Sequence, residues 1–249
     1  MNAEDRSFSS TEPLGIGLPP LDLPRAPPVV PDYLRETFGW AYVHPRSVRV
    51  FERQWLVNII LLGNDRRLRD AALDELSRQP RGNTLQVACV YGDFTAQLSQ
   101  RIGANGRLNV IDVLPVQLAN LRSKLGADSR VRLLHQDAAG LTLPDASYDQ
   151  AVVFFLLHEQ AEQVRRRTLA EAWRVVKAGG KSVVVDYCAP SWWHPLRVTM
   201  SALLRQLEPY TLDLWRQRVQ AFLPVAAAQA EIRKETFFGG LYQKLVVQC

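Results

Sequence analysis

The stretch Leu85-Gln86-Val87-Ala88-Cys89-Val90-Tyr91-Gly92-Asp93-Phe94-Thr95 decides the fold of this 249-residue chain. Its first half is apolar enough for a buried strand, its middle favours a turn, and Phe94 begins an amphipathic helical pattern. A strand that runs through a short turn into a helix is the unit from which parallel α/β sheets are built. The backbone N–H groups at such a helix start can meet the polar end of a cofactor.

Short apolar runs alternate with amphipathic stretches after this turn. The predicted strands are 85–90, 107–112, 131–136, 148–157 and 181–186, and the predicted helices are 94–102, 115–125 and 160–176. The repetition predicts a doubly wound α/β sheet that is covered on both faces and binds ligands at the carboxyl ends of its strands. Residues 232–237 and 241–247 read as two further strands joined by Gly239-Gly240. A terminal antiparallel hairpin separates this fold from a nicotinamide-binding Rossmann domain.

The chain before residue 81 has a different organisation. Seven prolines between residues 13 and 31 exclude regular helix and central strand, so residues 1–31 are predicted to form an extended arm. Helix-like apolar spacing over 32–38, 45–62 and 65–76 predicts a helical lid over residues 32–80. The α/β domain then spans residues 81–249.

The composition of the chain limits the binding partners and the compartment that we expect for the protein. The formal charge of +5 would suit nucleic acid, an anionic membrane or an acidic ligand, but the bases are scattered among acids, and Arg165-Arg166-Arg167 reads as a solvated helix face. We therefore expect no nucleic-acid partner. The apolar runs are too short to span a bilayer, and the first residues lack a secretory pattern. Three cysteines without metal spacing fit a reducing compartment, so we expect a cytoplasmic protein.

Residues 84–186 resemble the class I S-adenosylmethionine-dependent methyltransferases, nearest to those that methylate ubiquinone and menaquinone precursors. The first motif is carried by residues 85–95, and Trp173-Arg174-Val175-Val176-Lys177-Ala178-Gly179-Gly180-Lys181 resembles the helix, Leu-Lys-Pro-Gly-Gly turn and fifth strand of that family. Within the first motif, Gln86 replaces the usual acid, Ala88 and Val90 replace two glycines, and Gly92 remains.

The resemblance implies a seven-stranded sheet with a helical N-terminal lid and a site for S-adenosylmethionine. Asp112 ends the second strand, where an acid can accept hydrogen bonds from ribose hydroxyls, and Asp137 ends the third, where the family holds the adenine amino group. The full set of predicted cofactor-binding residues is Tyr42, Gln86, Ala88, Tyr91, Gly92, Asp112, Val113, Asp137, Ala138 and Phe154. Each acid alone is more often a cap or loop residue, but their joint order favours the cofactor site.

Two segments resemble more specifically the rhodoquinone biosynthesis protein family: Val90-Tyr91-Gly92-Asp93 and Asp186-Tyr187-Cys188-Ala189-Pro190-Ser191-Trp192-Trp193-His194-Pro195. That resemblance implies conversion of ubiquinone to rhodoquinone, in which an amino group from S-adenosylmethionine replaces a ring methoxy group with the help of manganese or another divalent metal. The predicted catalytic residues are Tyr91, Asp93, His158 and Asp186. The predicted metal ligands are His158, Asp186 and His194, with Glu159 as a further candidate, although each histidine alone is more often a core or surface residue.

The neutral side chain of Gln86 suits amino transfer in physical terms. A carboxylate at this position would favour the charged ammonium form of the methionyl amino group, whereas an amine that attacks a quinone ring must be neutral. We therefore hypothesise that restoring glutamate at position 86 suppresses amination and leaves cofactor binding intact.

The apolar stretch after the fifth strand allows two interpretations. Trp192, Trp193, Leu196, Met200 and the following leucines can form a core helix, or they can form a channel for an isoprenoid tail with the tryptophans at the surface of the inner membrane. Tyr42 in the lid is a candidate to cover the cofactor.

Three functions remain open at this point. The first is quinone amination, and the alternative is a methyltransferase that acts on a quinone or another small molecule. A noncatalytic binding protein is the third, and Asp112 and Asp137 argue against it.

Overall fold

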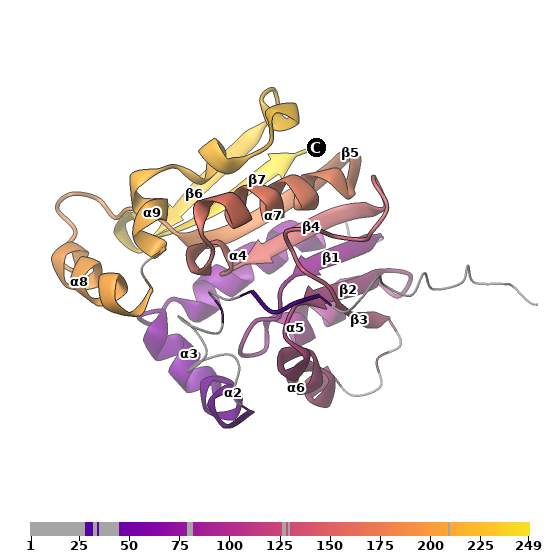
Figure 1. Ribbon diagram of the computed structural model, residues 1–249, viewed down its shortest axis with the longest axis horizontal. Coiled ribbons are helices and arrows are strands. Elements are labelled where there is room, and N and C mark those ends of the chain that lie inside the picture. Colours follow the sequence, from indigo (N-terminus) through magenta and orange to yellow (C-terminus); the bar gives the residue numbers. More distant parts are fainter. Residues whose placement is uncertain are drawn as a thin grey trace, which may run out of the picture.

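The computed structural model describes residues 28–31, 34, 45–78, 82–125, 128, 130–208 and 210–249. Its centre is a seven-stranded sheet in the order β3-β2-β1-β4-β5-β7-β6 (Figure 1). The strands are β1 (Asn83–Val87), β2 (Arg107–Asp112), β3 (Val131–His135), β4 (Tyr148–Phe154), β5 (Val176–Tyr187), β6 (Ile232–Phe237) and β7 (Tyr242–Gln248). Strands β1 to β5 run parallel and β7 runs antiparallel to both neighbours. The predicted doubly wound α/β sheet with a terminal hairpin is confirmed.

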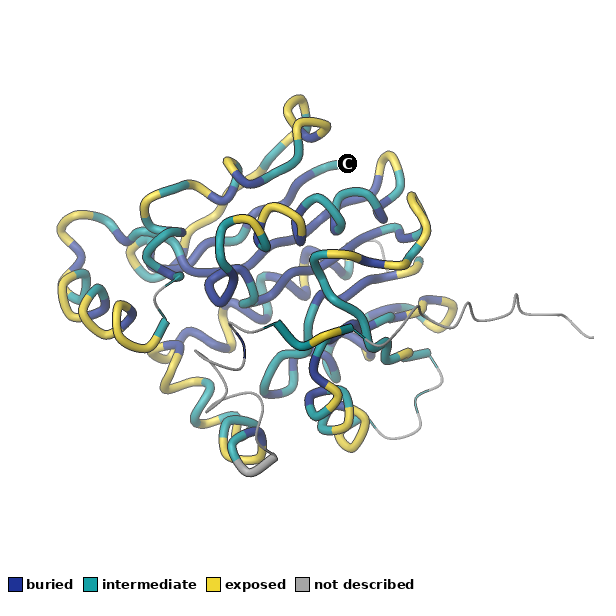
Figure 2. The backbone as a smooth tube through the Cα atoms, in the orientation of Figure 1, coloured by how far each residue is buried: buried dark blue, intermediate teal, exposed yellow. Residues whose placement is uncertain are grey.

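Helices cover both faces of the sheet. The helices are α4 (Asp65–Ser77), α5 (Phe94–Arg101), α6 (Pro115–Leu125), α7 (Glu162–Arg174), α8 (Arg197–Leu207) and α9 (Thr211–Arg216). One buried cluster joins α4, α5 and α8 to one face, and a second joins α7 and α9 to the other. Figure 2 shows the central strands β1, β4, β5 and β7 mostly buried between these layers and much of α8 exposed. Because both faces are covered, strand β4 is apolar along most of its length and fully buried at Ala151 and Val152.

The strand order places the candidate site. Strand β1 lies between β2 and β4, so the connections leaving β1 and β4 cross to opposite faces of the sheet. In open α/β sheets such a switch point opens a crevice at the carboxyl ends of the strands. Residues 85–95 therefore place their turn, residues 88–93, at the floor of this crevice.

The lid is more broken than its apolar spacing predicts. Residues 45–62 form two short helices, α2 (Pro45–Phe51) and α3 (Gln54–Ile60), instead of one. The break falls at Glu52 and Arg53, where the side chains of Glu52 and Gln54 turn toward the turn that follows β1. Helix α4 matches its predicted range, and most of the predicted arm and of the helix 32–38 lies outside the described residues.

The solvated-face interpretation of the arginine cluster is wrong for Arg165, which is fully buried. Its guanidinium donates hydrogen bonds to the carbonyls of Leu157 at 2.9 Å, Gln160 at 2.8 Å and Tyr210 at 3.1 Å. It also lies over the ring of Phe222, 4.8 Å from the centroid. Five donors in a rigid plane allow arginine to satisfy several carbonyls at once, so Arg165 ties the loop after β4 to α9.

Candidate functional site

A polar cleft lies at the carboxyl ends of β1, β2 and β3. Its lining residues are Leu34, Ala88, Cys89, Ile111, Asp112, Val113, Leu114, Gln117, Gln136, Asp137, Ala138, Phe155, Leu156, Glu159 and Gln160. Five predicted cofactor-binding residues, Ala88, Asp112, Val113, Asp137 and Ala138, are therefore brought together here. We name this hollow the cofactor cleft.

Asp112 is the electrostatic centre of the cofactor cleft. Its Oδ2 accepts the backbone N–H of Cys89 at 2.8 Å, and its Oδ1 accepts that of Leu114 at 2.7 Å. Burial raises the pKa of the Asp112 carboxyl to about 6, although the two backbone N–H groups oppose the rise. The Cys89 thiol, a weak donor, also hydrogen-bonds this carboxylate, so a pair of ribose hydroxyls would bind here by taking the remaining lone pair and the place of the thiol.

The turn above β1 keeps the geometry of a glycine loop without its glycines. Ala88 adopts a φ of 72°, a left-handed conformation that glycine adopts without penalty and that costs another L residue about 1–2 kcal/mol. Gly92 also has a positive φ of 81°, and a Cβ atom there would lie 2.5 Å from Gln54 Oε1. Alanine at position 88 is therefore tolerated at the cost of backbone strain. Glycine is favoured at position 92 because the lid approaches it closely.

Gln86 does not reach the cofactor cleft. Its side chain is fully buried under the turn, where Nε2 donates to the Ala88 carbonyl at 3.0 Å and to Thr95 Oγ1 at 2.9 Å. The assignment of Gln86 as a cofactor contact is thus wrong, because the strand pleat turns its side chain beneath the loop. Its role in the structure is to join the turn to the first residues of α5.

This placement changes what glutamate at position 86 should do. In Gln86→Glu a carboxylate would face the Ala88 carbonyl without a proton to donate, so we expect a loss of about 1–3 kcal/mol in the free energy of unfolding at neutral pH. Burial raises the pKa of the new carboxyl in the folded state, and its protonated form can donate to Ala88. The loss should therefore be small near pH 5 and grow toward pH 8, where the folded state must give up the proton.

Urea unfolding of Gln86→Glu and the unchanged protein across this pH range tests the effect. Gln229→Glu, at an exposed position before β6, is the matched control for the same chemical change. A loss that does not depend on pH would contradict the buried contact between position 86 and the Ala88 carbonyl.

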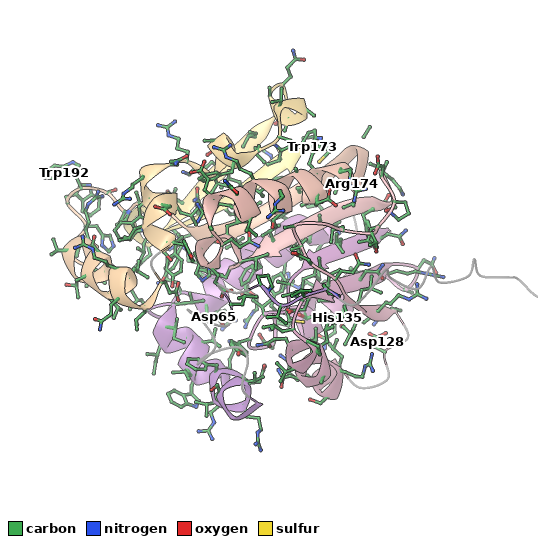
Figure 3. All side chains as sticks on the ribbon, in the orientation of Figure 1. Asp65, Asp128, His135, Trp173, Arg174 and Trp192 are labelled. Atoms are coloured by element: carbon green, nitrogen blue, oxygen red, sulfur yellow. The ribbon has the colours of Figure 1, made fainter. Side chains whose placement is uncertain are left out.

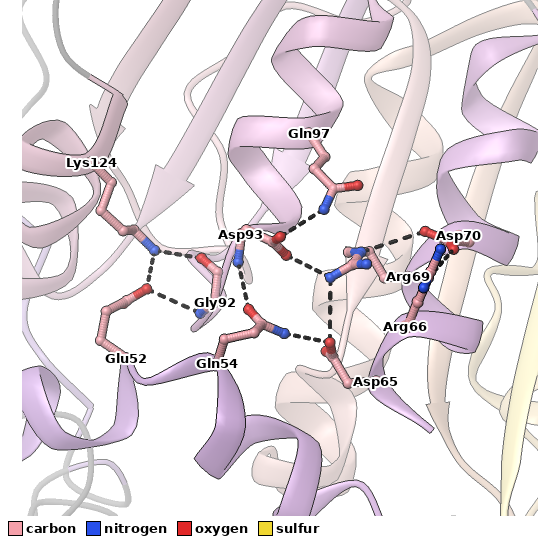
Figure 4. Close-up of polar contacts among 10 residues, drawn as sticks. All are labelled: Glu52, Gln54, Asp65, Arg66, Arg69, Asp70, Gly92, Asp93, Gln97 and Lys124. Atoms are coloured by element: carbon pink, nitrogen blue, oxygen red, sulfur yellow. Dashed lines mark hydrogen bonds and ion pairs between the residues drawn. The ribbon is translucent and has the colours of Figure 1, made fainter. Parts of the chain in front are cut away.

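The lid is fastened to the turn by a polar network that we call the lid latch, made of Glu52, Gln54, Gly92, Asp93 and Lys124 (Figure 4). Glu52 Oε1 accepts the Gly92 N–H at 3.1 Å, and Gln54 Oε1 accepts the Asp93 N–H at 3.2 Å. Lys124 donates both to Glu52 and, at 2.8 Å, to the Gly92 carbonyl. The latch therefore takes up two backbone N–H groups at the start of α5.

Asp93, a predicted catalytic residue, lies on the outer side of the turn. Its Oδ1 accepts Arg69 Nη1 at 2.7 Å and its Oδ2 accepts Gln97 Nε2 at 2.7 Å. The side chain is 46% exposed and lines neither the cofactor cleft nor the cavity beside it. Asp93 thus anchors α4 to α5, and the structure does not bring it together with the other predicted catalytic residues.

A second hollow, the apolar cavity, adjoins the cofactor cleft and has a volume of about 310 Å³. Its lining residues are Phe51, Leu56, Val57, Ile60, Leu61, Asp65, Cys89, Val90, Tyr91, Phe94, Gln117, Phe154, Phe155, His158, Glu159, Tyr187, Leu207 and Glu208. Four residues line both hollows: Cys89, Gln117, Phe155 and Glu159. The size and the aromatic wall suit a ring-shaped ligand next to a bound cofactor.

Two predicted cofactor-binding residues lie in the wall of the apolar cavity instead of the cofactor cleft. Phe154 stacks on Phe94 with 4.3 Å between ring centroids. The Tyr91 hydroxyl accepts a hydrogen bond from Gln117 at 2.9 Å, and burial raises its pKa. Because Gln117 borders both hollows, Tyr91 stands close to their junction.

The structure brings His158 and Asp186 together. His158 lies in the short helix η2 (Leu157–Glu159), and its Nδ1 is 3.0 Å from Asp186 Oδ1 at the end of β5. Burial alone would lower the pKa of His158, but the carboxylates of Asp186, Glu208 and Glu159 raise it to about 10.

His194 does not join that pair. Its Nδ1 accepts the Leu196 N–H at 3.2 Å and its ring packs against Phe238, 5.3 Å between centroids. Within the described residues, no group of three or more His, Cys, Asp or Glu side chains is arranged to hold a metal ion. The predicted ligand set His158, Asp186 and His194 therefore does not fit a metal site.

Several residues of the site were not predicted from the sequence. Tyr42, which was predicted, lies outside the described residues. The missed ones are Leu34, Glu52, Gln54, Gln117, Lys124 and Glu208. One signal was available for α6, because Gln117, Asn120 and Lys124 recur at helical spacing and share a face. All three donate hydrogen bonds to the turn or the lid.

Comparisons with known proteins agree with this architecture. A family model described as "Methyltransferase domain" matches residues 84–180. Demethylmenaquinone methyltransferase of Deinococcus radiodurans is 34% identical over 140 residues, which make up 55% of this chain and 56% of that protein. Ubiquinone/menaquinone biosynthesis C-methyltransferase UbiE of Azotobacter vinelandii is 32% identical over 140 residues, 55% of this chain and 54% of that protein. The chain thus spans little more than half the length of these relatives.

Solved structures share the fold at low sequence identity. A SAM-dependent methyltransferase from Aquifex aeolicus superposes with a TM-score of 0.51 at 17% identity, over 82% of this chain and 97% of that one. Human N-acetylserotonin methyltransferase in complex with SAM gives a TM-score of 0.59 at 14% identity, over 88% of this chain and 60% of that one. The chain therefore has the class I methyltransferase fold and is related in sequence to the demethylmenaquinone and ubiquinone/menaquinone methyltransferases.

Proposed function

We propose that this protein is an S-adenosylmethionine-dependent transferase whose substrate is a quinone or a quinone precursor. The observation that carries the proposal is the pairing of two hollows, a cleft with buried acids and an aromatic-walled cavity, that share Cys89, Gln117, Phe155 and Glu159. A cofactor held at Asp112 would present its reactive end to a ring in the apolar cavity. The relatives named for quinone methylation support this substrate class.

The chain's own residues divide the work between binding and shielding. Asp112 would accept the ribose hydroxyls, and Asp137 stands at the end of β3 beside it to meet the adenine. When bound, S-adenosylmethionine supplies an electrophilic methyl group or, in the second candidate reaction, an amino group. Phe94, Phe154 and Phe155 exclude water from the neighbouring cavity, which strengthens every polar interaction inside it.

Methyl transfer to a ring atom is the first candidate reaction, because the relatives carry that activity in their names. The replacement of a ring methoxy group by an amino group is the second. The specific observation in its favour is the altered turn: Ala88 and Val90 stand at glycine positions, and the Tyr91 hydroxyl is held near the junction of the two hollows. The product distinguishes the two reactions.

Mass spectrometry of the quinone product is the deciding experiment. The purified protein is incubated with S-adenosylmethionine and either ubiquinone or a demethylated quinone precursor, with and without manganese. Gain of a methyl group would establish methyl transfer, and exchange of methoxy for amino would establish the rhodoquinone-forming reaction. Unchanged quinones in the presence of bound cofactor would refute the proposed substrate class.

We also propose that the protein takes its substrate from a membrane surface on the cytoplasmic side. No helix among the described residues is long and apolar enough to cross a bilayer. Trp192 is 86% exposed, Trp193 is 62% exposed, and Trp192 points outward beyond α8 (Figure 3). Ile60 and Leu207 are partly exposed and also line the apolar cavity, so exposed apolar side chains surround its opening.

The double variant Trp192→Ser/Trp193→Ser is expected to weaken binding to lipid vesicles by at least about tenfold, since each buried indole contributes 1–3 kcal/mol at an interface. Co-sedimentation with vesicles of neutral and anionic phospholipid measures the loss. Val225→Ser, at an exposed apolar residue of η4 (Val225–Ala227), is the matched control and should bind like the unchanged protein. Equal losses in both variants would contradict a specific membrane face.

A further inference from the structure

His158 is held between carboxylates at both of its ring nitrogens. Nδ1 is 3.0 Å from Asp186 Oδ1, and Nε2 is 3.3 Å from Glu208 Oε2. Glu159 Oε1 lies 3.8 Å from Nε2. Because an ionised carboxylate is an acceptor only, this arrangement favours a proton on each ring nitrogen and thus a cationic His158 in the wall of the apolar cavity.

The inner side of this arrangement is rigid. Asp186 is fully buried, and its carboxylate also accepts the backbone N–H groups of Leu157 at 2.8 Å and Tyr187 at 2.7 Å. Arg165 holds the carbonyl of Leu157 from the other side at 2.9 Å. These contacts fix the Asp186 carboxylate and η2, and thereby fix the plane and direction of the imidazole ring.

The contact on the outer side, between His158 Nε2 and Glu208, can be exchanged for a contact with a ligand. Glu208 follows the last residue of α8, its side chain is 21% exposed, and it lines the apolar cavity next to the partly exposed Leu207. Asp186 is held by two backbone N–H groups inside the core, whereas Glu208 Oε2 accepts a hydrogen bond from Thr211 Oγ1 at 3.2 Å and its side chain reaches solvent, so Glu208 is the partner that can turn away. The donor at Nε2 is therefore the one that a ligand can take over.

We propose that His158 Nε2–H binds a ring oxygen of the substrate, that Glu208 holds this donor until the substrate replaces it, and that Asp186 is the positioning residue. The inference rests on the proposed function, because it takes the ligand of the apolar cavity to be an oxygen-bearing ring. In amino transfer a cationic donor at that oxygen stabilises the negative charge that a quinone carbonyl gains when the amine adds to the ring. In methyl transfer the ring oxygen loses negative charge, so there the contact binds and orients the ring. The same contact serves a hydroquinone oxygen and a quinone carbonyl.

Two probes separate the oxygen contact from apolar burial. One is a ubiquinone with a single isoprene unit, and the other is the alkylbenzene with the same tail and no ring oxygens. Dissociation constants are measured for the full chain, for His158→Phe, for Glu208→Gln and for the surface control Glu162→Gln. Phenylalanine preserves a flat ring against Phe155 and Tyr187, whose centroids lie 6.0 and 5.1 Å from that of His158.

The unchanged protein should prefer the quinone over the alkylbenzene, and His158→Phe should lose about tenfold in quinone affinity with the alkylbenzene affinity unchanged. Glu208→Gln should bind the quinone about threefold more tightly, because a neutral amide competes less well for the donor than a carboxylate. A merely structural role for Glu208 would not improve binding.

Retained quinone preference in folded His158→Phe, or weaker quinone binding in Glu208→Gln, would overturn the inference. If His158→Phe does not fold, Glu208→Gln decides alone. Equal binding of both probes by the unchanged protein would refute the oxygen contact and leave the apolar cavity of the proposed function standing. Binding of neither probe would refute the proposed function and this inference together.

Discussion

Replacing Asp112 by asparagine is expected to weaken S-adenosylmethionine binding by about a hundredfold, because two hydrogen bonds to a charged acceptor are worth about 3 kcal/mol together. In Asp112→Asn an NH2 group replaces one carboxylate oxygen and would face the backbone N–H of Cys89 or Leu114, from which it cannot accept a hydrogen bond. The side chain would turn to avoid this, so its one remaining oxygen would no longer point at the ligand. Calorimetric titration with S-adenosylmethionine measures the loss. Asp74→Asn, at an exposed acid of α4 paired with Arg101, is the matched control.

The same residue gives the binding a pH dependence. The carboxylate is the form that accepts two hydroxyls, and its pKa in the folded protein is about 6. Affinity should therefore be constant above pH 7 and fall by up to about tenfold for each unit below pH 6, as the carboxyl takes up a proton. A fall that persists unchanged in Asp112→Asn would assign the titration to another group.

Replacing Arg165 by methionine is expected to destabilise the protein by about 3–5 kcal/mol, the range for breaking a buried charged network. Three carbonyls, those of Leu157, Gln160 and Tyr210, would lose their donor. Because Leu157 opens η2, the loss should also loosen His158 and reduce substrate binding in the variant that remains folded.

Thermal and urea unfolding measure the stability of Arg165→Met, with Arg167→Met on the exposed face of the same helix as the control. Similar midpoints for the two variants would contradict the buried network. Arg165→Lys should fall between them, since a single ammonium cannot reach all three carbonyls in one plane.

Helices and strands could be predicted from local sequence patterns where one side of the element is consistently apolar. Strands Arg107–Asp112 and Ile232–Phe237 and helix Pro115–Leu125 have the predicted bounds. Strand β5 begins at Val176, five residues before its predicted start, because the glycine pair predicted as a turn lies inside the strand. Gly179 takes a φ of 79° there, and the register with β4 shifts between Tyr148 and Gln150.

The site followed only where the topology fixes a position. Asp112 and Asp137 could be predicted because parallel strands deliver their carboxyl ends to one edge of the sheet. The positions of the Gln86 and Asp93 side chains could not be predicted. A residue's nearness to the turn in the sequence does not say toward which side its side chain points. Glu208 reaches His158 from the far end of α8, and no local signal marks a partner that lies fifty residues away in the chain.

The wall that the cofactor cleft shares with the apolar cavity ties the two binding events together. Cys89, Gln117, Phe155 and Glu159 contribute to both hollows, so an occupant of one alters the packing and charge that the other offers. Thermodynamic linkage makes that influence reciprocal: by whatever factor an occupant of the cofactor cleft changes the affinity of the apolar cavity for its ligand, that ligand changes the affinity of the cofactor cleft. One coupling free energy, measured from either side, therefore characterises the whole site.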